Sequence, residues 1–378
     1  MSSLNFLEKL LDGVEVEWST LGNDRYIEIA NRGRKPVKAS FRQPGKIPYF
    51  GANNIQDYVE GYTHDGTFVL IAEDGSASLE NYSIQYVTGK FWANNHVHVV
   101  RGKSGLNTRF LLHYLCVVNF IPYLSGGGRA KLTKGKMLQI PIPIPCPDNP
   151  EKSLEIQSEI VRILDTFTEL TTELTTELTA RKKQYSYYRD QLLSFEEGEV
   201  EWKMLGEAIK LQRGRRLVKS QLKVSGSYAV YQNSMTPLGY HSDSNVQADT
   251  AFVICAGAAG EIGYSNVDFW AADDVHYLIT PKNIESKFAY YFLLTQQHKI
   301  MGQVRRASVP RLAKSAIERL DFPVPTIQEQ TRIVFILDKF DTLTHSISEG
   351  LPREIELRQK QYEYYRDLLL SFPKPETV

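Results

Sequence analysis

Apolar residues recur at steps of three and four along two long stretches of the chain, residues 154–195 and 327–372. In the first stretch they are Ile160, Ile163, Phe167, Leu170, Leu174, Leu178, Tyr185, Tyr188, Leu192 and Phe195. In the second they are Ile333, Ile336, Phe340, Leu343, Ile347, Leu351, Ile355, Tyr362, Tyr365, Leu369 and Phe372. This spacing places one apolar seam along a helix, and about 40 helical residues extend roughly 60 Å. A helix of that length needs a partner, and we expect each stretch to pack against the other.

The two stretches are copies of one another. The segment KQYSYYRDQLLSF at 183–195 returns as KQYEYYRDLLLSF at 360–372, with eleven of thirteen positions identical. An upstream segment also recurs 173 residues later, because Ile163-Leu-Asp165 matches Ile336-Leu-Asp338. The second copy contains a glycine and a proline at positions 350 and 352, which predict a kink or an interruption of its helix.

The blocks before each long helix repeat more faintly. The matching segments are 16–18 with 200–202, 32–34 with 213–215, and 91–93 with 269–271. Short strand-like runs separated by turn residues fill both blocks. Each block then has one helix, for which Asn107 and Ser286 are the expected N-caps. The prolines between 141 and 147, and those at 323 and 325, predict that regular structure stops before each long helix begins.

These patterns predict an α+β protein in which two α/β globular domains alternate with two long helices. The predicted boundaries are 1–153 for the first globular domain, 154–197 for the first helix, 198–326 for the second domain and 327–378 for the second helix. The chain is therefore expected to resemble a dimer fused into one polypeptide, with two related but unequal halves.

The amino-acid composition indicates to which broad class the protein belongs. With 378 residues the chain can form two or three domains with their own cores, and its 42% hydrophobic and 23% charged residues are ordinary for a soluble protein. Three cysteines without a CxxC pair favour a reduced compartment. No signal-peptide pattern and no run of 18 apolar residues is present, so we expect a cytoplasmic protein with no membrane partner.

The formal net charge of zero conceals a partition along the chain. Residues 14–150 carry 15 basic and 11 acidic side chains, and residues 201–326 carry the same numbers, so each globular block has a net charge of +4. Residues 151–200 carry a net charge of −5, and residues 327–378 a net charge of −2. Overall neutrality therefore does not argue against a polyanionic ligand.

Two basic clusters occupy matching positions in each block. In the first block the candidate DNA-binding residues are Arg32, Arg34, Lys35, Arg129, Lys131, Lys134 and Lys136. In the second they are Arg213, Arg215, Arg216, Arg305, Arg306, Arg311 and Lys314. A single cluster of this kind is more often a solvated face, but its recurrence in both blocks favours contact with phosphates. Arginine can in addition read guanine in the major groove.

The ends of the long helices carry more aromatic surface than a two-helix seam can bury. The residues are Tyr185, Tyr187, Tyr188, Tyr362, Tyr364 and Tyr365. One interpretation is packing against the neighbouring globular domain. The other is docking of partner subunits, because tyrosine is enriched at such interfaces.

A search for catalytic patterns returns none that fits. The glycine run at 126–128 does not meet the spacing of a phosphate loop. His96 and His98 alternate on a predicted strand and so point to one face, as two metal ligands would, but packed histidines are favoured. The pairs Asn94-Asn95 and Asp273-Asp274 are more typical of turns than of base contacts. The sequence therefore predicts a binding protein without catalytic residues, cofactor or metal.

Taken together, these features resemble the specificity subunits of type I restriction-modification systems. The resemblance covers the whole chain and rests on two variable blocks, each followed by an Ile-Pro or Phe-Pro junction, an Ile-Leu-Asp segment and a Tyr-Tyr-Arg-Asp helix end. It implies that each block is a target recognition domain that reads one half of a bipartite, asymmetric DNA site. It further implies that the helices form an antiparallel coiled coil with pseudo-twofold symmetry, which sets the spacer between the half-sites.

The same resemblance implies the partners of the chain. These are double-stranded DNA, two methyltransferase subunits docked around the helices, and restriction or motor subunits that join through the complex and carry the catalysis. Two other classes of protein remain as alternatives. An orphan DNA-binding scaffold would lack methyltransferase and restriction partners, whereas a stand-alone modification enzyme is disfavoured because the catalytic motifs are missing.

Overall fold

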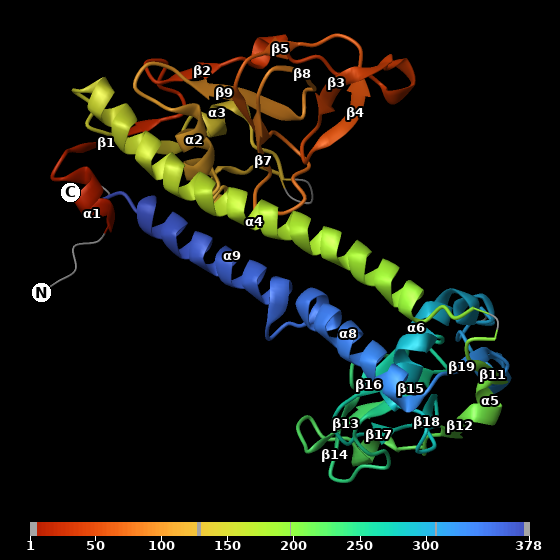
Figure 1. Ribbon diagram of the computed structural model, residues 1–378. Helices are drawn as coiled ribbons and strands as arrows, with labels where there is room; N and C mark the ends of the chain where they lie inside the picture. The colour runs from red at the N-terminus through yellow and green to blue at the C-terminus, as the bar shows by residue number, and fades with distance from the viewer. Residues whose placement is uncertain (1–5, 127–129, 197, 307, 374–378) are drawn as a thin grey trace, which may run out of the picture. The chain divides into compact units, whose positions relative to one another are not determined.

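The computed structural model describes residues 6–126, 130–196, 198–306 and 308–373, and its chain divides into two units (Figure 1). Unit 1 comprises Met1–Glu173 and Ile355–Val378, and unit 2 comprises Leu174–Glu354. The helix α4, Pro150–Leu192, is continuous and contributes its first part to unit 1 and its last part to unit 2. The repeat seen in the sequence thus corresponds to a division of the structure into two units.

The first long helix begins four residues earlier than the pattern suggested. Pro150 occupies its first position, where the missing N–H of proline costs no hydrogen bond. Asn149 precedes it, and the Asn149 side chain accepts a hydrogen bond from the backbone N–H of Lys152 at 3.1 Å. This arrangement is an N-cap, which explains the earlier start.

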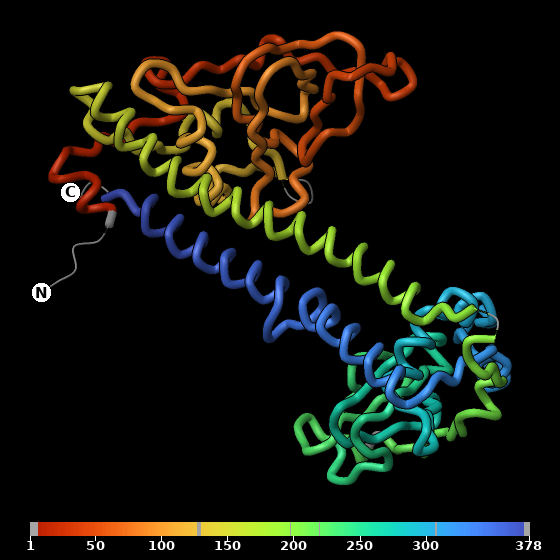
Figure 2. Tube along the Cα trace, viewed as in Figure 1, coloured from red at the N-terminus to blue at the C-terminus, as the bar shows by residue number. Residues whose placement is uncertain are grey.

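The second long helix is interrupted, as Gly350 and Pro352 predicted. It consists of α8, Ile327–His345, and α9, Gly350–Leu369, and the break between them can be followed along the trace in Figure 2. Gly350 has a φ of +79°, and a Cβ atom there would lie 2.4 Å from the carbonyl oxygen of Thr342. Ile347 was expected in the apolar seam, but it lies in the break and its side chain is 85% exposed.

The described strands of unit 1 form three sheets. A two-stranded sheet pairs β1, Val16–Thr20, with β10, Pro141–Pro145. A four-stranded sheet has the order β2, Ile27–Ile29; β9, Val97–Gly102; β6, Phe68–Ala72; β7, Ile84–Val87. Another has the order β4, Ile55–Val59; β3, Pro44–Phe50; β8, Lys90–Ala93; β5, His64–Asp65. Besides α4 and α9, the described part of this unit has the α-helices α1, Phe6–Leu11; α2, Thr108–Leu115; and α3, Lys134–Met137.

Unit 2 repeats this topology, with three described strands in place of four in its last sheet. Its two-stranded sheet pairs β11, Glu201–Met204, with β19, Asp321–Val324. Its larger sheet has the order β12, Lys210–Arg213; β18, Val275–Ile279; β15, Thr250–Ile254; β16, Ile262–Ser265. The third has the order β14, Gly239–His241; β13, Tyr228–Tyr231; β17, Trp270–Ala271. Besides the long helices, the described part of this unit has the α-helices α5, Leu205–Ala208; α6, Ser286–Gly302; and α7, Lys314–Glu318.

The proline-rich junctions are strands, which corrects the expectation that regular structure stops there. Prolines occupy every second position of β10 and therefore leave the same edge of the strand without N–H donors. The intervening Ile142 and Ile144 point the other way and are buried. Pairing of β10 with β1 on a single side is compatible with this pattern, because a two-stranded sheet consists of edge strands only.

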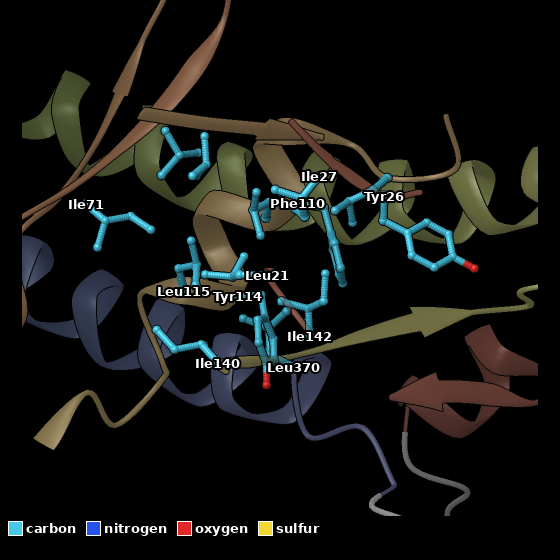
Figure 3. Close-up of a cluster of buried hydrophobic side chains, with 14 of the residues drawn as sticks. Leu21, Tyr26, Ile27, Ile71, Phe110, Tyr114, Leu115, Ile140, Ile142 and Leu370 are labelled. Atoms are coloured by element: carbon cyan, nitrogen blue, oxygen red, sulfur yellow. The ribbon is translucent and has the colours of Figure 1, made fainter. Parts of the chain in front are cut away.

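The core of unit 1 joins segments that are far apart in the sequence. Phe110, Tyr114 and Leu115 of α2 pack with Ile142 of β10 and with Leu370, which follows α9 (Figure 3). The apolar face of α4 at Ile156, Ile160 and Leu164 belongs to the same cluster. In unit 2, Tyr185 of α4 and Ile333 and Leu337 of α8 pack with α6. Part of each helical seam therefore anchors a globular domain.

The helices also contact one another within each unit. In unit 1 the rings of Phe167 and Tyr365 stack with centroids 5.3 Å apart. In unit 2, Tyr188 stacks on Phe340 at 5.7 Å, and Tyr185 contacts His345 at 5.6 Å. Within unit 2 the partner number falls as the α4 number rises, so α8 runs antiparallel to α4 there. None of the described helices is long and apolar enough to cross a membrane.

Candidate nucleic-acid interface

In each unit the backbone of one basic residue is held by the same pair of hydrogen bonds, one to a backbone carbonyl and one from a tryptophan side chain. In unit 1 the N–H of Lys35 donates to the carbonyl of Ala93 at 3.0 Å, and the indole N–H of Trp92 donates to the carbonyl of Lys35 at 2.7 Å. In unit 2 the corresponding bonds run from Arg215 to Ala271 at 2.9 Å and from Trp270 to Arg215 at 3.2 Å. Lys35 therefore corresponds to Arg215, one residue out of register with the sequence match of Arg34 to Arg215.

The two basic clusters of unit 1 meet at one carboxylate. Arg34 donates to Glu73 at 2.6 Å and to the carbonyl of Val97 at 2.8 Å, and the Lys131 ammonium lies 3.1 Å from Glu73. Burial alone would raise the pKa of Glu73, but the hydrogen bonds from Arg34 and Lys131 lower this pKa below its ordinary value. Arg34 is half-buried and its charge is balanced by Glu73. Its main role is therefore to stabilise the domain fold and not to bind a ligand.

The second basic cluster begins on a matching hairpin in both units. In unit 1 the backbones of Ser125 and Lys131 exchange two hydrogen bonds, and in unit 2 Arg305 and Arg311 do the same. The next residue in each case donates to the carbonyl of the residue that follows β6 or β15, from Leu132 to Glu73 at 2.7 Å and from Leu312 to Cys255 at 2.9 Å. The hairpins thus lie on equivalent places of the two domains. Arg129 falls outside the described residues.

Most of the predicted basic side chains are exposed. The exposed ones are Arg32, Lys35, Lys131, Lys134, Lys136, Arg213, Arg215, Arg216, Arg305, Arg306, Arg311 and Lys314. Several of them also have intramolecular partners. Lys131 lies 3.1 Å from Glu73, Arg213 donates to the carbonyl of Asp273 at 2.6 Å, and Lys314 pairs with Glu318 at 2.6 Å. The clusters therefore present cationic side chains to solvent, as a phosphate-binding surface requires.

The tyrosines of the helix ends divide into two groups. Tyr185 is buried and Tyr362 is half-buried against the core of its own unit, which favours the packing interpretation for both. Tyr187 and Tyr364 are 62% and 65% exposed. Each lies edge-on to the following tyrosine, Tyr188 or Tyr365, which are the other exposed members of the group. The four exposed rings are candidates for a partner interface.

Sequence reasoning missed a buried glutamine that each long helix supplies to its domain. In unit 1, Gln157 accepts from the N–H of Asn107 at 2.8 Å and donates to the carbonyl of Gly105 at 2.9 Å. In unit 2, Gln330 accepts from Glu285 and donates to the carbonyl of Asn283 at the same two distances. Both glutamines are fully buried. The two glutamines are 173 residues apart, as are the two copies of the Ile-Leu-Asp segment, and this shared spacing could have identified them from the sequence.

The repeated aspartate of that segment holds the same domain helix. Asp165 accepts from Arg109 at 2.9 Å and from the buried His113 at 2.8 Å. Asp338 accepts from Lys287 at 2.9 Å and from the buried Tyr291 hydroxyl at 2.6 Å. Burial is the main cause that lowers the pKa of His113, and the nearby carboxylate of Asp165 opposes it. An aspartate–glutamine pair therefore fixes α2 or α6 on its long helix in each unit.

The helix caps and turns are partly as expected. Asn107 caps α2 by accepting from the N–H groups of Arg109 and Phe110. Ser286 does not cap α6, because its hydroxyl accepts from the N–H of Ala251 at 3.1 Å and Glu285 occupies the cap position. The Asn94 side chain accepts from His96 N–H within a turn, in agreement with the turn interpretation.

The paired histidines are engaged within the domain. His98 is fully buried and lies 2.8 Å from the carbonyl of Leu132 and 3.0 Å from Asn31, while His96 pairs with Asp74. Burial lowers the pKa of His98. Within the described ranges no group of three or more histidine, cysteine or acidic side chains could hold a metal ion.

Comparison with known proteins places these features in a family. The family model described as type I restriction modification DNA specificity domain matches the chain twice, at residues 15–182 and 197–357. A Haemophilus influenzae protein described as a type I restriction enzyme specificity subunit is 47% identical over 97% of this chain and 98% of its own length. The EcoR124I/EcoR124II specificity subunit of Escherichia coli is 39% identical over the full length of both chains.

A solved structure shares the fold. The crystal structure of a type I restriction-modification S subunit from M. genitalium aligns with a TM-score of 0.66 and covers 96% of this chain and 98% of that one. Its sequence identity is 18%, so this likeness concerns the fold.

Proposed function

This chain belongs to the type I restriction modification DNA specificity family, and we propose that it supplies the DNA sequence specificity of a restriction-modification complex. Each globular domain reads one half of a bipartite, asymmetric DNA site. The chain itself carries no catalytic role. Methyltransferase subunits and restriction or motor subunits, assembled on it, perform the chemistry.

The observation that carries this proposal is the duplication of a cationic domain on a helical frame. The family model matches once in each half of the chain, and the tryptophan bond, the basic hairpin and the aspartate–glutamine pair occur in both units. Two related domains suit a two-part target, as the subunits of a dimer suit two half-sites. Because the domains have diverged, the two halves of the target differ.

The long helices are proposed to act as the spacer between the half-sites. The stacking of Phe167 on Tyr365 in unit 1 and of Tyr188 on Phe340 in unit 2 supports an antiparallel coiled coil of α4 with α8 and α9. A continuous helix transmits distance and rotation along its length, since each residue adds about 1.5 Å and about 100°. The length of α4 then determines the unspecified gap in the DNA site.

The exposed tyrosines are proposed to dock the methyltransferase subunits. Tyr187 and Tyr364 occupy equivalent positions and expose large aromatic surfaces that their own units leave uncovered. Replacing both by alanine should reduce co-purification of the methyltransferase subunit while the thermal transition of the isolated chain stays in place. The matched control is Tyr58→Ala, which removes a similarly exposed ring from β4. Equal loss with the control would count against docking at the helix ends.

The alternative of an orphan DNA-binding scaffold is not favoured, because relatives that match over the full length are subunits of restriction enzymes. One experiment decides between the two. Methylated bases are mapped genome-wide in the source organism with and without the gene for this chain. The proposal predicts loss of methylation at one bipartite motif with a constant gap. An unchanged methylation map, together with failure to bind any methyltransferase subunit, would favour the scaffold.

A further inference from the structure

In both units the same backbone contacts surround Trp92 or Trp270, but the surface segment held by the tryptophan differs in sequence. We define the recognition segments as residues 35–43 in unit 1 and 215–223 in unit 2. Each begins at the residue held by the tryptophan and contains one turn of 3-10 helix, Ala39–Phe41 or Lys219–Gln221. The strand that follows, β3 or β13, pairs in parallel with the strand that carries the tryptophan. The backbone frame of the two segments is therefore repeated.

The side chains on this repeated frame are not repeated. The two segments read KPVKASFRQ and RRLVKSQLK, and only the serine at Ser40 and Ser220 is common to both. Phe41 and Val218 are 70% and 52% exposed, so these apolar side chains contribute little to either core. A constant frame with variable and exposed side chains is the arrangement expected of an element that determines specificity.

A pocket opens beside each segment. In unit 1 it has a volume of about 510 Å³ and is lined by Lys35, Val37, Phe41, Arg42, Tyr49 and Trp92 among others. The guanidinium of Arg42 lies 4.1 Å from the centre of the Tyr49 ring and donates to the carbonyl of Val37 at 3.2 Å. In unit 2 the pocket has a volume of about 790 Å³ and includes Leu217, Leu222, Lys223, Leu238 and Tyr240. Each domain thus has a pocket beside its recognition segment that is lined by cationic and apolar side chains, and the two pockets differ in size and lining.

We propose that the recognition segments read the edges of the DNA bases and that Lys35 and Arg215 each contact a guanine. This inference rests on the proposed function, which supplies the DNA. Base readout needs a side chain whose backbone is held in a fixed position, and Lys35 and Arg215 are held at both the N–H and the carbonyl. Lysine and arginine pair preferentially with the O6 and N7 acceptors of guanine in the major groove.

The remaining basic residues are assigned a different role. Lys131, Lys134 and Arg311 lie on or beside the hairpins and not on the recognition segments. They contact phosphates, which position the duplex without reading its sequence. The exposed apolar side chains next to the held cation then discriminate neighbouring base pairs by contact with thymine methyl groups and by shape.

The test uses the full chain in complex with its methyltransferase partner and a duplex library with both half-sites randomised. The variants are Lys35→Ala, Arg215→Ala and Trp92→Phe, and the control is Lys134→Ala. Lys35→Ala should relax one G·C position in one half-site by about 10- to 100-fold, and Arg215→Ala should do so in the other. Trp92→Phe keeps the ring but removes the N–H donor to Lys35, and it should relax the same position to a smaller extent.

The control separates base contact from phosphate contact. Lys134→Ala should weaken binding to all sequences alike and lower the salt dependence by about one charge. The inference is overturned if Lys35→Ala behaves as Lys134→Ala does, if its motif is unchanged, or if Trp92→Phe leaves that position intact. Failure of the wild-type complex to select any bipartite motif would instead overturn the proposed function, so the two failures are distinguishable.

Discussion

The aspartate that holds each domain helix on its long helix offers a quantitative test of the two-unit structure. Asp165→Ala removes the acceptor of the buried His113 ring, which we expect to cost about 1–3 kcal/mol. Loss of the partly exposed ion pair with Arg109 adds at most about 1 kcal/mol. The sum of about 1–4 kcal/mol should lower the Tm of unit 1 by about 2–16 °C, because domains of this size lose about 2–4 °C per kcal/mol.

The matched variant in the other unit is Asp338→Ala. It removes the acceptor of the buried Tyr291 hydroxyl and of Lys287, and the expected loss in the free energy of unfolding is similar. Amide hydrogen exchange of each variant reports which helix opens. Asp165→Ala should accelerate exchange in α2 and leave α6 protected, whereas Asp338→Ala should do the reverse.

Either of two results would refute this reasoning. Equal acceleration of exchange in α2 and α6 by one variant would show that the two units do not open separately. A Tm that Asp165→Ala leaves unchanged would show that the carboxylate does not hold the helix. Asp165→Asn is the control for shape, and we expect it to lose less stability than Asp165→Ala, because its amide oxygen can still accept from His113.

Three further predictions follow from other contacts. Deleting residues 173–176, one of the ELTT repeats within α4, removes about 6 Å of helix and a net turn of about 40°. Methylation mapping should then show that the gap between the half-sites is shorter by about one base pair. An unchanged gap would argue against the spacer role of the helix. Tyr185→Phe should leave the Tm equal or higher, because the buried Tyr185 hydroxyl has no hydrogen-bond partner among the described residues, whereas Tyr291→Phe should lower the Tm through loss of the bond to Asp338. Burial lowers the pKa of His98, His113 and His276 from the ordinary value of 6.5, so the unfolded chain binds more protons than the folded chain near that pH. The free energy of unfolding should therefore be highest above pH 6.5 and should fall as the pH drops below it. Equal free energies of unfolding from urea titrations at pH 7.5 and 5.5 would contradict the lowered histidine pKa values.

The long helices and the duplication could be recognised from the sequence alone. Helical periodicity is a local property, since residues three and four apart share a face whatever the rest of the chain does. For the same reason, Gly350 and Pro352 predicted the break between α8 and α9, and Asn107 predicted the cap of α2. The basic clusters were also visible, because charge and its recurrence are read directly from composition.

The role of each side chain within those elements depended on partners distant in the chain. Arg34 and Lys35 are neighbours in one basic run, but Arg34 turns to Glu73 whereas Lys35 is held by Trp92 and stays exposed. The prolines of β10 form a strand only because β1 offers a pairing edge. Such contacts form only on folding, when the entropic cost of closing the loop between distant residues is met. No local sequence pattern therefore predicts them.

The same distinction applies to the candidate site as a whole. The sequence by itself determined which segments are helical, which blocks are repeated and where the positive charge accumulates, because these depend on short-range periodicity and composition. Only the tertiary structure decided that Tyr185 is buried while Tyr187 is exposed, and that Lys35 and Arg215 occupy equivalent positions one residue out of register with the sequence match. Burial and hydrogen bonding of this kind are set by packing between segments, which the order of residues along the chain does not display.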